Sequence, residues 1–265
     1  MARQRATLYG TLVCALLVLL AVAATAGSAW AVTFDDGQHA YRDGDYATAL
    51  QIFRRLAERG NATAQDALGR MYARGEGVPQ DKAEASRWFK MAEDERNGFT
   101  AYNRGDFPTA LRIYRPLAER GQVFAEYTIG LMYANGQGVP QDYAEALKWH
   151  RKAAEQGEAR AQFSVGVMYF KGFGTAQNRA EAFKWYLRAA NQGEPTAQYN
   201  VAAMYAKGEV VARDPVTAIM FYTLAAVRNV RAAGPAKAQL EKSMSAEQVA
   251  EAMKRVYAWQ AKPEE

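Results

Sequence analysis

The sequence predicts an all-α protein, a right-handed superhelical solenoid of stacked helix-turn-helix repeats. One observation is a helical hairpin at residues 125–157, where two helical patterns flank a glycine-containing loop. A second is that this unit returns with a fixed period, which is typical of solenoids whose helix pairs pack on their neighbours. The glycines that mark the loop lie 36 residues apart, at Gly136, Gly172 and Gly208. A third is that the repeats stop after Arg228 and an amphipathic helix follows, as a terminal cap requires.

The first helix of the hairpin carries its apolar residues at helical spacing, with Ile129, Met132 and Tyr133 on one face. Gly130 lies on the same face and has no side chain, so we expect a neighbouring helix to approach closely there. Gly136 follows, and glycine adopts left-handed backbone angles without a steric penalty. We therefore expect the helix to end at Gly136.

The second helix follows a turn at residues 138–141. Asp142 is expected to cap this helix, with Glu145 three residues later as its capping-box partner. Trp149 and Ala153 lie on one face of the helix. Because one hairpin cannot bury both of its faces alone, the pattern requires stacked copies.

Further copies extend the pattern along the chain. Full hairpins also begin at Ala64, Ala161 and Ala197. Shorter tetratricopeptide-like half-units with a tight Gly-Asp turn occur at residues 40–60 and again at residues 101–121. Together the copies predict about six helical hairpins over residues 32–229.

These hairpins resemble the Sel-1-like repeat family, a branch of the tetratricopeptide-like superhelical repeats. The first two full hairpins match its pattern A-x-x-x-L-G-x-x-Y-x-x-G-x-G-V almost throughout. The copy from Ala161 has Asn178 in place of the loop aspartate, and the copy from Ala197 has Phe221 in place of the tryptophan. The resemblance implies the solenoid fold, and such folds serve many different partners.

Residues 1–31 are predicted to be a secretory signal peptide. Two arginines precede an apolar run at residues 8–24, and Ala29-Trp30-Ala31 provides a small-x-small cleavage site. We expect export to a bacterial periplasm and a mature chain that begins at Val32. The alternative is a membrane anchor through residues 8–26, because the apolar run approaches spanning length.

Residues 230–265 are predicted to form the capping helices and tail that close the solenoid. Ser245 and Gln248 have the spacing of a capping box at the start of a helix. That helix places Val249 and Met253 on one face and charged residues away from it. Such a helix can cover the last repeat while remaining in contact with water.

The composition excludes several classes of function. The 265 residues carry a net charge of +5, but the charges of both signs are interspersed, without the basic stripe that nucleic-acid binding needs. His39 and His150 lack metal-ligand spacing, and we interpret His150 as a surface or half-buried structural residue. The one cysteine, Cys14, lies in the predicted signal peptide, and no nucleophile motif is present. We expect a non-enzymatic protein with no catalytic residue, cofactor or metal site.

The candidate binding surface is a concave groove. In tetratricopeptide-like superhelices the first helix of each pair lines the concave side, so the resemblance implies that one face of each first helix lies there. The expected positions are Tyr127, Leu131 and Asn135; Asp66, Arg70 and Arg74; Phe163, Val167 and Lys171; and Tyr199, Ala203 and Lys207. Three rings then form a ladder with cations along one edge. The alternative is that the rings pack between adjacent helices.

The sequence therefore predicts an exported scaffold that binds an extended protein or peptide, with carboxylates favoured by the lysines. One alternative is carbohydrate binding in envelope or exopolysaccharide assembly, because ladders of aromatic rings also suit sugars. Another is a β-lactam or peptidoglycan hydrolase, which the cysteine-rich relatives in the family suggest. Those relatives carry a disulfide in each repeat, and its absence here argues against the hydrolase. Membrane contact is expected only through an uncleaved signal segment.

Overall fold

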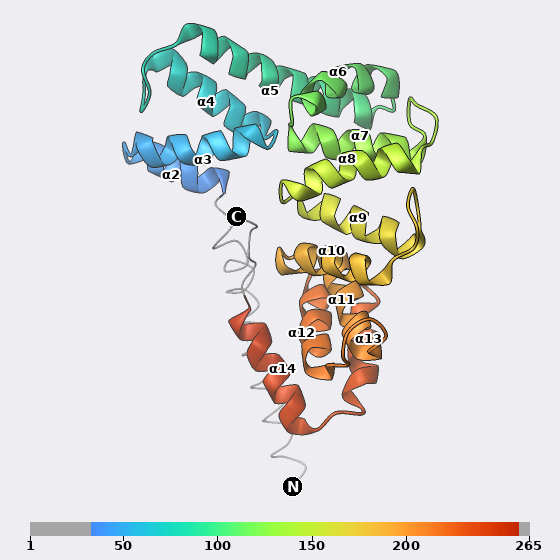
Figure 1. The fold of residues 1–265 in the computed structure, drawn as a ribbon. Helices are drawn as coiled ribbons and strands as arrows, with labels where there is room; N and C mark the ends of the chain where they lie inside the picture. Colours follow the sequence, from blue (N-terminus) through green and yellow to red (C-terminus); the bar gives the residue numbers. More distant parts are fainter. Residues whose placement is uncertain (1–32, 260–265) are drawn as a thin grey trace.

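The computed structural model describes residues 33–259, and this part of the chain contains helices and no strand. The helices follow one another in a curved row, and each one from α3 to α13 packs on the helix before it (Figure 1). In chain order they are α2 (Phe34–Arg42), α3 (Tyr46–Glu58), α4 (Ala62–Arg74), α5 (Lys82–Asn103), α6 (Phe107–Glu119), α7 (Val123–Asn135), α8 (Tyr143–Glu155), α9 (Ala159–Lys171), α10 (Arg179–Asn191), α11 (Pro195–Lys207), α12 (Pro215–Val227), α13 (Ala233–Glu241) and α14 (Ala246–Ala258). The predicted all-α solenoid is confirmed. The predicted signal peptide, residues 1–31, lies outside the described residues.

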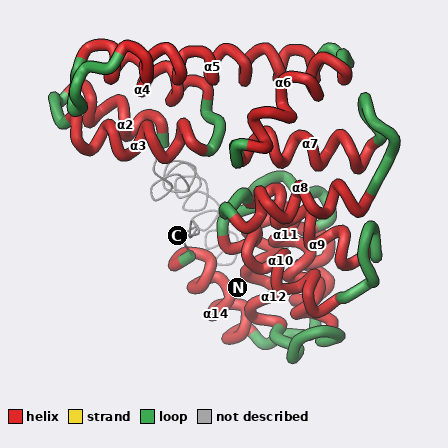
Figure 2. The backbone as a smooth tube through the Cα atoms, turned by 45° about the horizontal axis from the view of Figure 1, so that its top comes forward, coloured by secondary structure: helices red, strands yellow, loops and turns green. Residues whose placement is uncertain are grey.

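The glycine loops end the first helices as predicted. α7 stops at Gly136, whose φ of 68° is left-handed. Gly138, with φ of 72°, lies against the start of α6, where an added Cβ would be 2.9 Å from the Cβ of Phe107. The loop therefore needs glycine for its backbone angle at one position and for close packing at the other. The loops after α7 and α9 lie along the same edge of the molecule (Figure 2).

The predicted helix caps form, with one difference. Asp142 accepts hydrogen bonds from the backbone N–H groups of Ala144 and Glu145, at 2.8 and 3.0 Å. The Glu145 carboxylate, expected to return to the cap, accepts a bond from Lys148 Nζ at 3.1 Å. The capping box of Ser245 and Gln248 is complete, and its helix, α14, packs on α12 together with α13.

The helix α5 is longer than the repeat pattern indicates. The sequence separates the hairpin from Ala64 and the half-unit at 101–121, but one 22-residue helix joins them. In later hairpins the second helix ends near a left-handed glycine, such as Gly157 with φ of 84°. Arg96 stands at the equivalent position, so nothing stops the helix there. Figures 1 and 2 show α5 running from the α2–α4 end of the row to α6.

The close approach predicted at the first-helix glycines is confirmed, and the structure identifies what approaches. A Cβ at Gly130 would lie 2.6 Å from His150 Nδ1, and one at Gly166 would lie 2.6 Å from Tyr186 Cδ1. Both rings come from the second helix of the same hairpin. Because glycine has no side chain, the two helices of one hairpin pack closely, with the second-helix ring lying against the glycine.

Buried glutamines hold successive hairpins together, a feature that the sequence analysis did not identify. Each lies near the start of a first helix, and its amide donates to a carbonyl eight residues earlier, in the preceding second helix. The bonds run from Gln65 to Ala57, from Gln162 to Ala154 and from Gln198 to Ala190, at 3.0, 3.1 and 3.2 Å. Because these side chains are buried, each bond also satisfies a polar group that would otherwise be costly to bury.

None of the helices between residues 33 and 259 combines the length and apolar character that crossing a membrane requires.

Candidate functional site

The predicted groove residues fall on one face of four first helices, which we call the first-helix face. It comprises Asp66, Arg70 and Arg74 on α4; Tyr127, Leu131 and Asn135 on α7; Phe163, Val167 and Lys171 on α9; and Tyr199, Ala203 and Lys207 on α11. Within each set the residues are four apart, so they follow one side of the helix. The last residue of each set is exposed, whereas the three aromatic rings are half-buried.

The three rings of this face pack on rings of the second helix in their own hairpin. The centroids are 5.4 Å apart for Tyr127 and His150, 5.7 Å for Phe163 and Tyr186, and 5.6 Å for Tyr199 and Tyr222. Such tilted ring pairs are favourable beyond the area they bury. Each ring of the first-helix face is therefore fixed by packing on one side and keeps part of its surface in contact with water.

His150 is buried, with 2% of its surface exposed, and not on the surface or half-buried as expected. Its ring fills the space that Gly130 leaves, which the sequence pattern did not reveal. Burial lowers the pKa of His150 to about 4 because the charged imidazolium is not solvated there. The residue is therefore neutral at physiological pH and serves the packing of α7 on α8.

One arginine, Arg160, lies over the ring of Tyr127. The guanidinium of Arg160 lies 5.0 Å from the centroid of that ring and 5.8 Å from that of Phe124. Glu158 holds this arginine through an Nε–Oε1 contact of 2.8 Å, and it also pairs with Arg59 at 3.6 Å. A cation over a ring face is attracted by the ring quadrupole. This part of the first-helix face thus combines an aromatic surface with positive charge.

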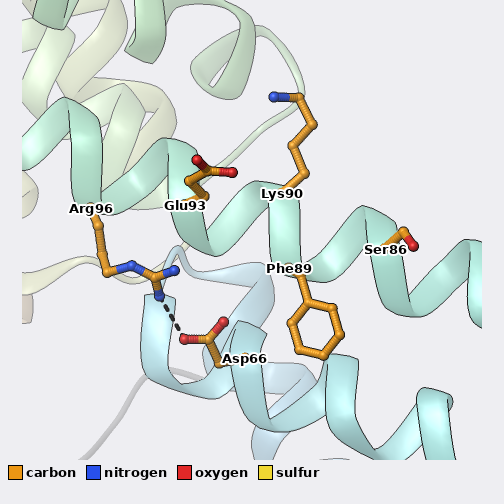
Figure 3. Close-up of a pocket in the computed structure, with 6 residues that line it drawn as sticks. All are labelled: Asp66, Ser86, Phe89, Lys90, Glu93 and Arg96. Carbon is orange, nitrogen blue, oxygen red and sulfur yellow. Dashed lines mark hydrogen bonds and ion pairs between the residues drawn. The ribbon is translucent and has the colours of Figure 1, made fainter.

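The hairpin of α4 and α5 differs, because it has no ring on its first-helix face. A shallow hollow of about 610 Å³ opens there, which we call the α4–α5 hollow (Figure 3). It is lined by Asp66, Ser86, Phe89, Lys90, Glu93 and Arg96. Phe89 points toward α4, and Arg96 reaches across to Asp66, with 2.6 Å between Nη1 and Oδ2. Lys90 and Glu93 point away from α4.

Asp66 was predicted to lie on this face, whereas Phe89 and Arg96 were not predicted as site residues. A signal for both was present in the repeat alignment. Phe89 is the equivalent of His150, and Arg96 stands where Gly157 ends a helix. A charged residue in place of a helix-ending glycine indicates both a continuous helix and a new side chain on its surface.

Two buried carboxyl groups lie between hairpins. Burial raises the pKa of Glu95 to about 8, and that of Glu126 to about 7. Glu126 Oε2 accepts a hydrogen bond from Gln156 Nε2 at 2.7 Å. Both side chains are at most 5% exposed, so they lie in the packing between helices and away from the first-helix face. Over residues 33–259, histidine, aspartate and glutamate side chains do not gather in groups of three or more that could hold a metal ion.

One known protein family has this repeat. The family model described as "Sel1 repeat" matches residues 30–61, 62–97, 123–158, 159–194 and 195–227. Residues 98–122, which include the end of α5 and all of α6, lie between the matched segments.

Individual proteins also resemble the chain. The ERAD-associated E3 ubiquitin-protein ligase component HRD3B of Arabidopsis thaliana is 29% identical over 99 residues, which is 35% of this chain and 16% of that protein. The crystal structure of a Sel1 repeat protein from Oxalobacter formigenes aligns with a TM-score of 0.53 and 28% identity, over 85% of this chain and 99% of the other. The structure of c5321, a protective antigen of uropathogenic Escherichia coli with an SLR fold, gives a TM-score of 0.46 and 24% identity, over 91% and 62% of the two chains.

Proposed function

Because the chain belongs to the Sel1 repeat family, whose solenoids typically serve protein–protein interaction, we propose that it is an exported scaffold without enzymatic activity. The scaffold binds an extended segment of a partner protein along the first-helix face. The whole protein named HRD3B is much longer than the segment it shares with this chain, so its role as a ligase component does not define the partner here.

The observation that carries the proposal is the ladder of rings at one equivalent position of three successive hairpins. Tyr127, Phe163 and Tyr199 are fixed on one side by a second-helix ring and are partly exposed on the other. Rings held in this way lose little conformational freedom when a partner binds, which favours affinity. Lys171 follows Phe163 by eight residues on α9, and Lys207 follows Tyr199 by eight residues on α11. Both lysines are exposed, and they favour a partner segment that carries carboxylates.

Capture from the native host tests the proposal. Alanine at the three rings should abolish capture of the partner protein while the helical circular-dichroism signal persists. Truncating anchors of this kind often costs about 2 kcal/mol of binding energy each. A variant that stays folded and captures the same partner would exclude the first-helix face as the binding site.

Charge reversal provides a matched pair of variants. Lys171→Glu with Lys207→Glu should weaken capture, most strongly at low salt, because salt screens exposed charges. Lys148→Glu with Lys184→Glu is the control, since those lysines are exposed on the second helices α8 and α10. Binding that is insensitive to salt and is competed by envelope polysaccharide would favour the carbohydrate alternative.

Export is tested separately, by intact-mass measurement of the chain from its native host. The signal-peptide pattern at residues 1–31 predicts a mature chain that begins at Val32. A chain that retains residues 1–31 in the membrane fraction would instead support an anchored scaffold.

A further inference from the structure

The helix α5 belongs to two hairpins. It packs on α4 as a second helix does, and it packs on α6 as well. A Cβ at Gly98, near the end of α5, would lie 2.9 Å from the ring of Tyr114 in α6. The same contact joins Gly130 of α7 to the ring of His150 in α8, at 2.6 Å. The end of α5 is therefore the first helix of a further hairpin, whose second helix is α6.

This alignment places Phe99 on the first-helix face. Phe99 directly follows the close-packed glycine of its helix, as Leu131 does on α7, so the two side chains hold the same position in their hairpins. The rings of Phe99 and Phe124 are 6.5 Å apart, and Phe124 lies one turn before Tyr127 on α7. The end of α5 thus lies beside α7, and the first-helix face continues onto it.

Phe99 begins a row of apolar side chains, which we call the apolar row. The same position is apolar in four successive hairpins, and the side chain becomes smaller along the row, from Phe99 through Leu131 and Val167 to Ala203. Phe99 is 52% exposed, and the other three are half-buried. Among residues 33–259, neither Phe99 nor Leu131 packs against a hydrophobic core cluster. The packing of the solenoid therefore does not account for these two side chains.

A second row lies four residues further along each first helix, about 6 Å from the apolar row. It comprises Asn103, Asn135, Lys171 and Lys207, all of them exposed. Within the part of the chain that the structure describes, neither lysine forms an ion pair. Glu95, which holds the ring position in the hairpin of α5 and α6, is only 5% exposed and is not paired with them. Unpaired positive charge therefore lies beside the small end of the apolar row.

We propose that the partner segment is apolar in one half and acidic in the other, with its apolar half over Phe99 and Leu131 and its acidic half beside Lys171 and Lys207. This inference rests on the proposed function, extends the binding face onto α5 and gives the segment its chemistry. The face has the same asymmetry, because its large apolar side chains lie on α5 and α7 and its lysines on α9 and α11. Apolar surface and unpaired cations at separate ends complement a segment divided in the same way. Phe99 is then the binding residue at the apolar end.

Labelled peptides and the purified full chain test the proposal by fluorescence anisotropy. The probe is Leu-Ser-Leu-Ser-Leu-Gly-Glu-Ser-Glu-Ser-Glu, measured together with its reversed sequence because the direction of the segment is open. Its leucines alternate with serines, so in an extended chain they face one side. The better of the two peptides should bind at least tenfold more tightly than a peptide of the same composition in which leucines and glutamates are intermixed. Equal binding of the divided and intermixed peptides would overturn the proposal.

A substitution at the apolar end provides the matched variant. Phe99→Ser should lower affinity for the divided peptide at least tenfold and leave the melting temperature nearly unchanged, because Phe99 lies outside the core clusters. Val227→Ser is the control, since Val227 is 51% exposed at the end of the second helix α12 and should leave affinity unchanged. If Phe99→Ser folds and binds the peptide as the unmodified chain does, the apolar half binds elsewhere and the proposal is wrong.

Failure of this inference can be distinguished from failure of the proposed function. Loss of partner capture in the Tyr127, Phe163 and Tyr199 triple variant, with normal capture and peptide binding by Phe99→Ser, would reject the extension onto α5 alone. Loss of peptide binding in Phe99→Ser, with normal capture by the triple variant, would reject the ring ladder and support the apolar row.

Discussion

At the scale of single residues, the most informative position is Glu126, because three other hairpins place glutamine there. Gln65, Gln162 and Gln198 each donate to a carbonyl eight residues earlier, a bond that a carboxylate cannot make. The equivalent carbonyl for Glu126 belongs to Ala118. Burial raises the pKa of Glu126 to about 7, so its charged form destabilises the fold above that pH.

Glu126→Gln should therefore stabilise the chain by about 1–2 kcal/mol at pH 8, through a new hydrogen bond and the loss of a buried charge. The gain should be smaller at pH 5, where Glu126 is already protonated in the folded chain. Urea denaturation at the two pH values measures this difference. Glu155→Gln is the control, since that carboxyl is 55% exposed and should change stability little. An equal effect of both variants at pH 8 would contradict the burial of Glu126.

Glu95 makes the stability of the fold depend on pH over a wider range than Glu126 does. It stands where Gln156 and Gln192 stand in later hairpins, beside Tyr114, and burial raises its pKa from the ordinary 4.5 to about 8. A raised carboxyl pKa means that the folded chain binds the proton more tightly than the unfolded chain does. Its contribution to stability is complete below about pH 4.5 and is lost as pH rises through 8.

We expect Glu95→Gln to flatten the pH dependence between those two values. The new amide can donate to Gln65 Oε1, which has no hydrogen-bond partner among residues 33–259, as Gln192 donates to Gln162 at 2.8 Å. Unfolding free energies measured from pH 5 to pH 9 check the result. A variant whose stability still falls over this range by as much as that of the unmodified chain would show that another group titrates.

At the scale of helices, the first-helix glycine decides how closely a hairpin can pack. Gly166→Ala places a Cβ 2.6 Å from the ring of Tyr186, so we expect a loss of about 1–3 kcal/mol from overpacking, and a larger loss for Gly166→Val. Gly234→Ala is the matched control within a helix, because nothing lies within 4 Å of that Cβ. It should stabilise α13 by up to about 1 kcal/mol through helix propensity.

Thermal melts of the Gly166 and Gly234 variants compare the two effects directly. An unchanged melting temperature for Gly166→Val would contradict the close contact of α9 with α10. The fourth hairpin carries Ala202 at the equivalent position, so the spacing of α11 and α12 must admit one methyl group more than that of α9 and α10.

The helices whose signals are local could be predicted from the sequence. Gly136 ends a helix because of its own backbone angle, and Asp142 and Ser245 cap helices through bonds to residues two or three positions away. α5 is long because Arg96 stands where other second helices have a helix-ending glycine. A missing stop signal is harder to recognise in a sequence than one that is present. The roles of Gln65 and His150 depend on partners in another helix, so periodicity alone could not assign them.

The candidate site also combines features that could be predicted from the sequence with features that could not. The resemblance to tetratricopeptide-like superhelices, together with the 36-residue period, predicted that Tyr127, Phe163 and Tyr199 share one face. It could not show that each ring rests on a second-helix ring, because that contact requires the register of two helices. The hollow beside Asp66 could not be predicted either, since one of its lining residues, Arg96, lies on the part of α5 that continues past the usual end of a second helix.

At the scale of the whole molecule, α5 is the connection between two series of hairpins. The first series comprises α2, α3, α4 and the first part of α5, over residues 34–97. The second series comprises α6 to α12, over residues 107–227. Further contacts join the two series at Arg59, which follows α3. Its guanidinium reaches Gly157 and Glu158 at the start of α9, with distances of 3.5 and 3.6 Å, and its carbonyl accepts a hydrogen bond from the backbone N–H of Phe124 in α7 at 3.4 Å. Contacts between hairpins so far apart in sequence are unusual in solenoids, where each repeat meets its neighbours.

A continuous α5 should make the two series unfold together, because the helix cannot be half-formed without losing contacts on both sides. Asn97→Pro removes one helical hydrogen bond at the middle of this connection and should cost about 3 kcal/mol or more. We expect it also to split urea unfolding into two transitions, one reported by Trp88 in the first series and one by Trp149 and Trp185 in the second. Lys148→Pro, in the interior of α8, carries the same intrinsic cost but interrupts a helix that belongs to a single hairpin. If both proline variants unfold in one transition at every tryptophan, the coupling does not pass through α5, and the contacts of Arg59 with α7 and α9 become the connection to test.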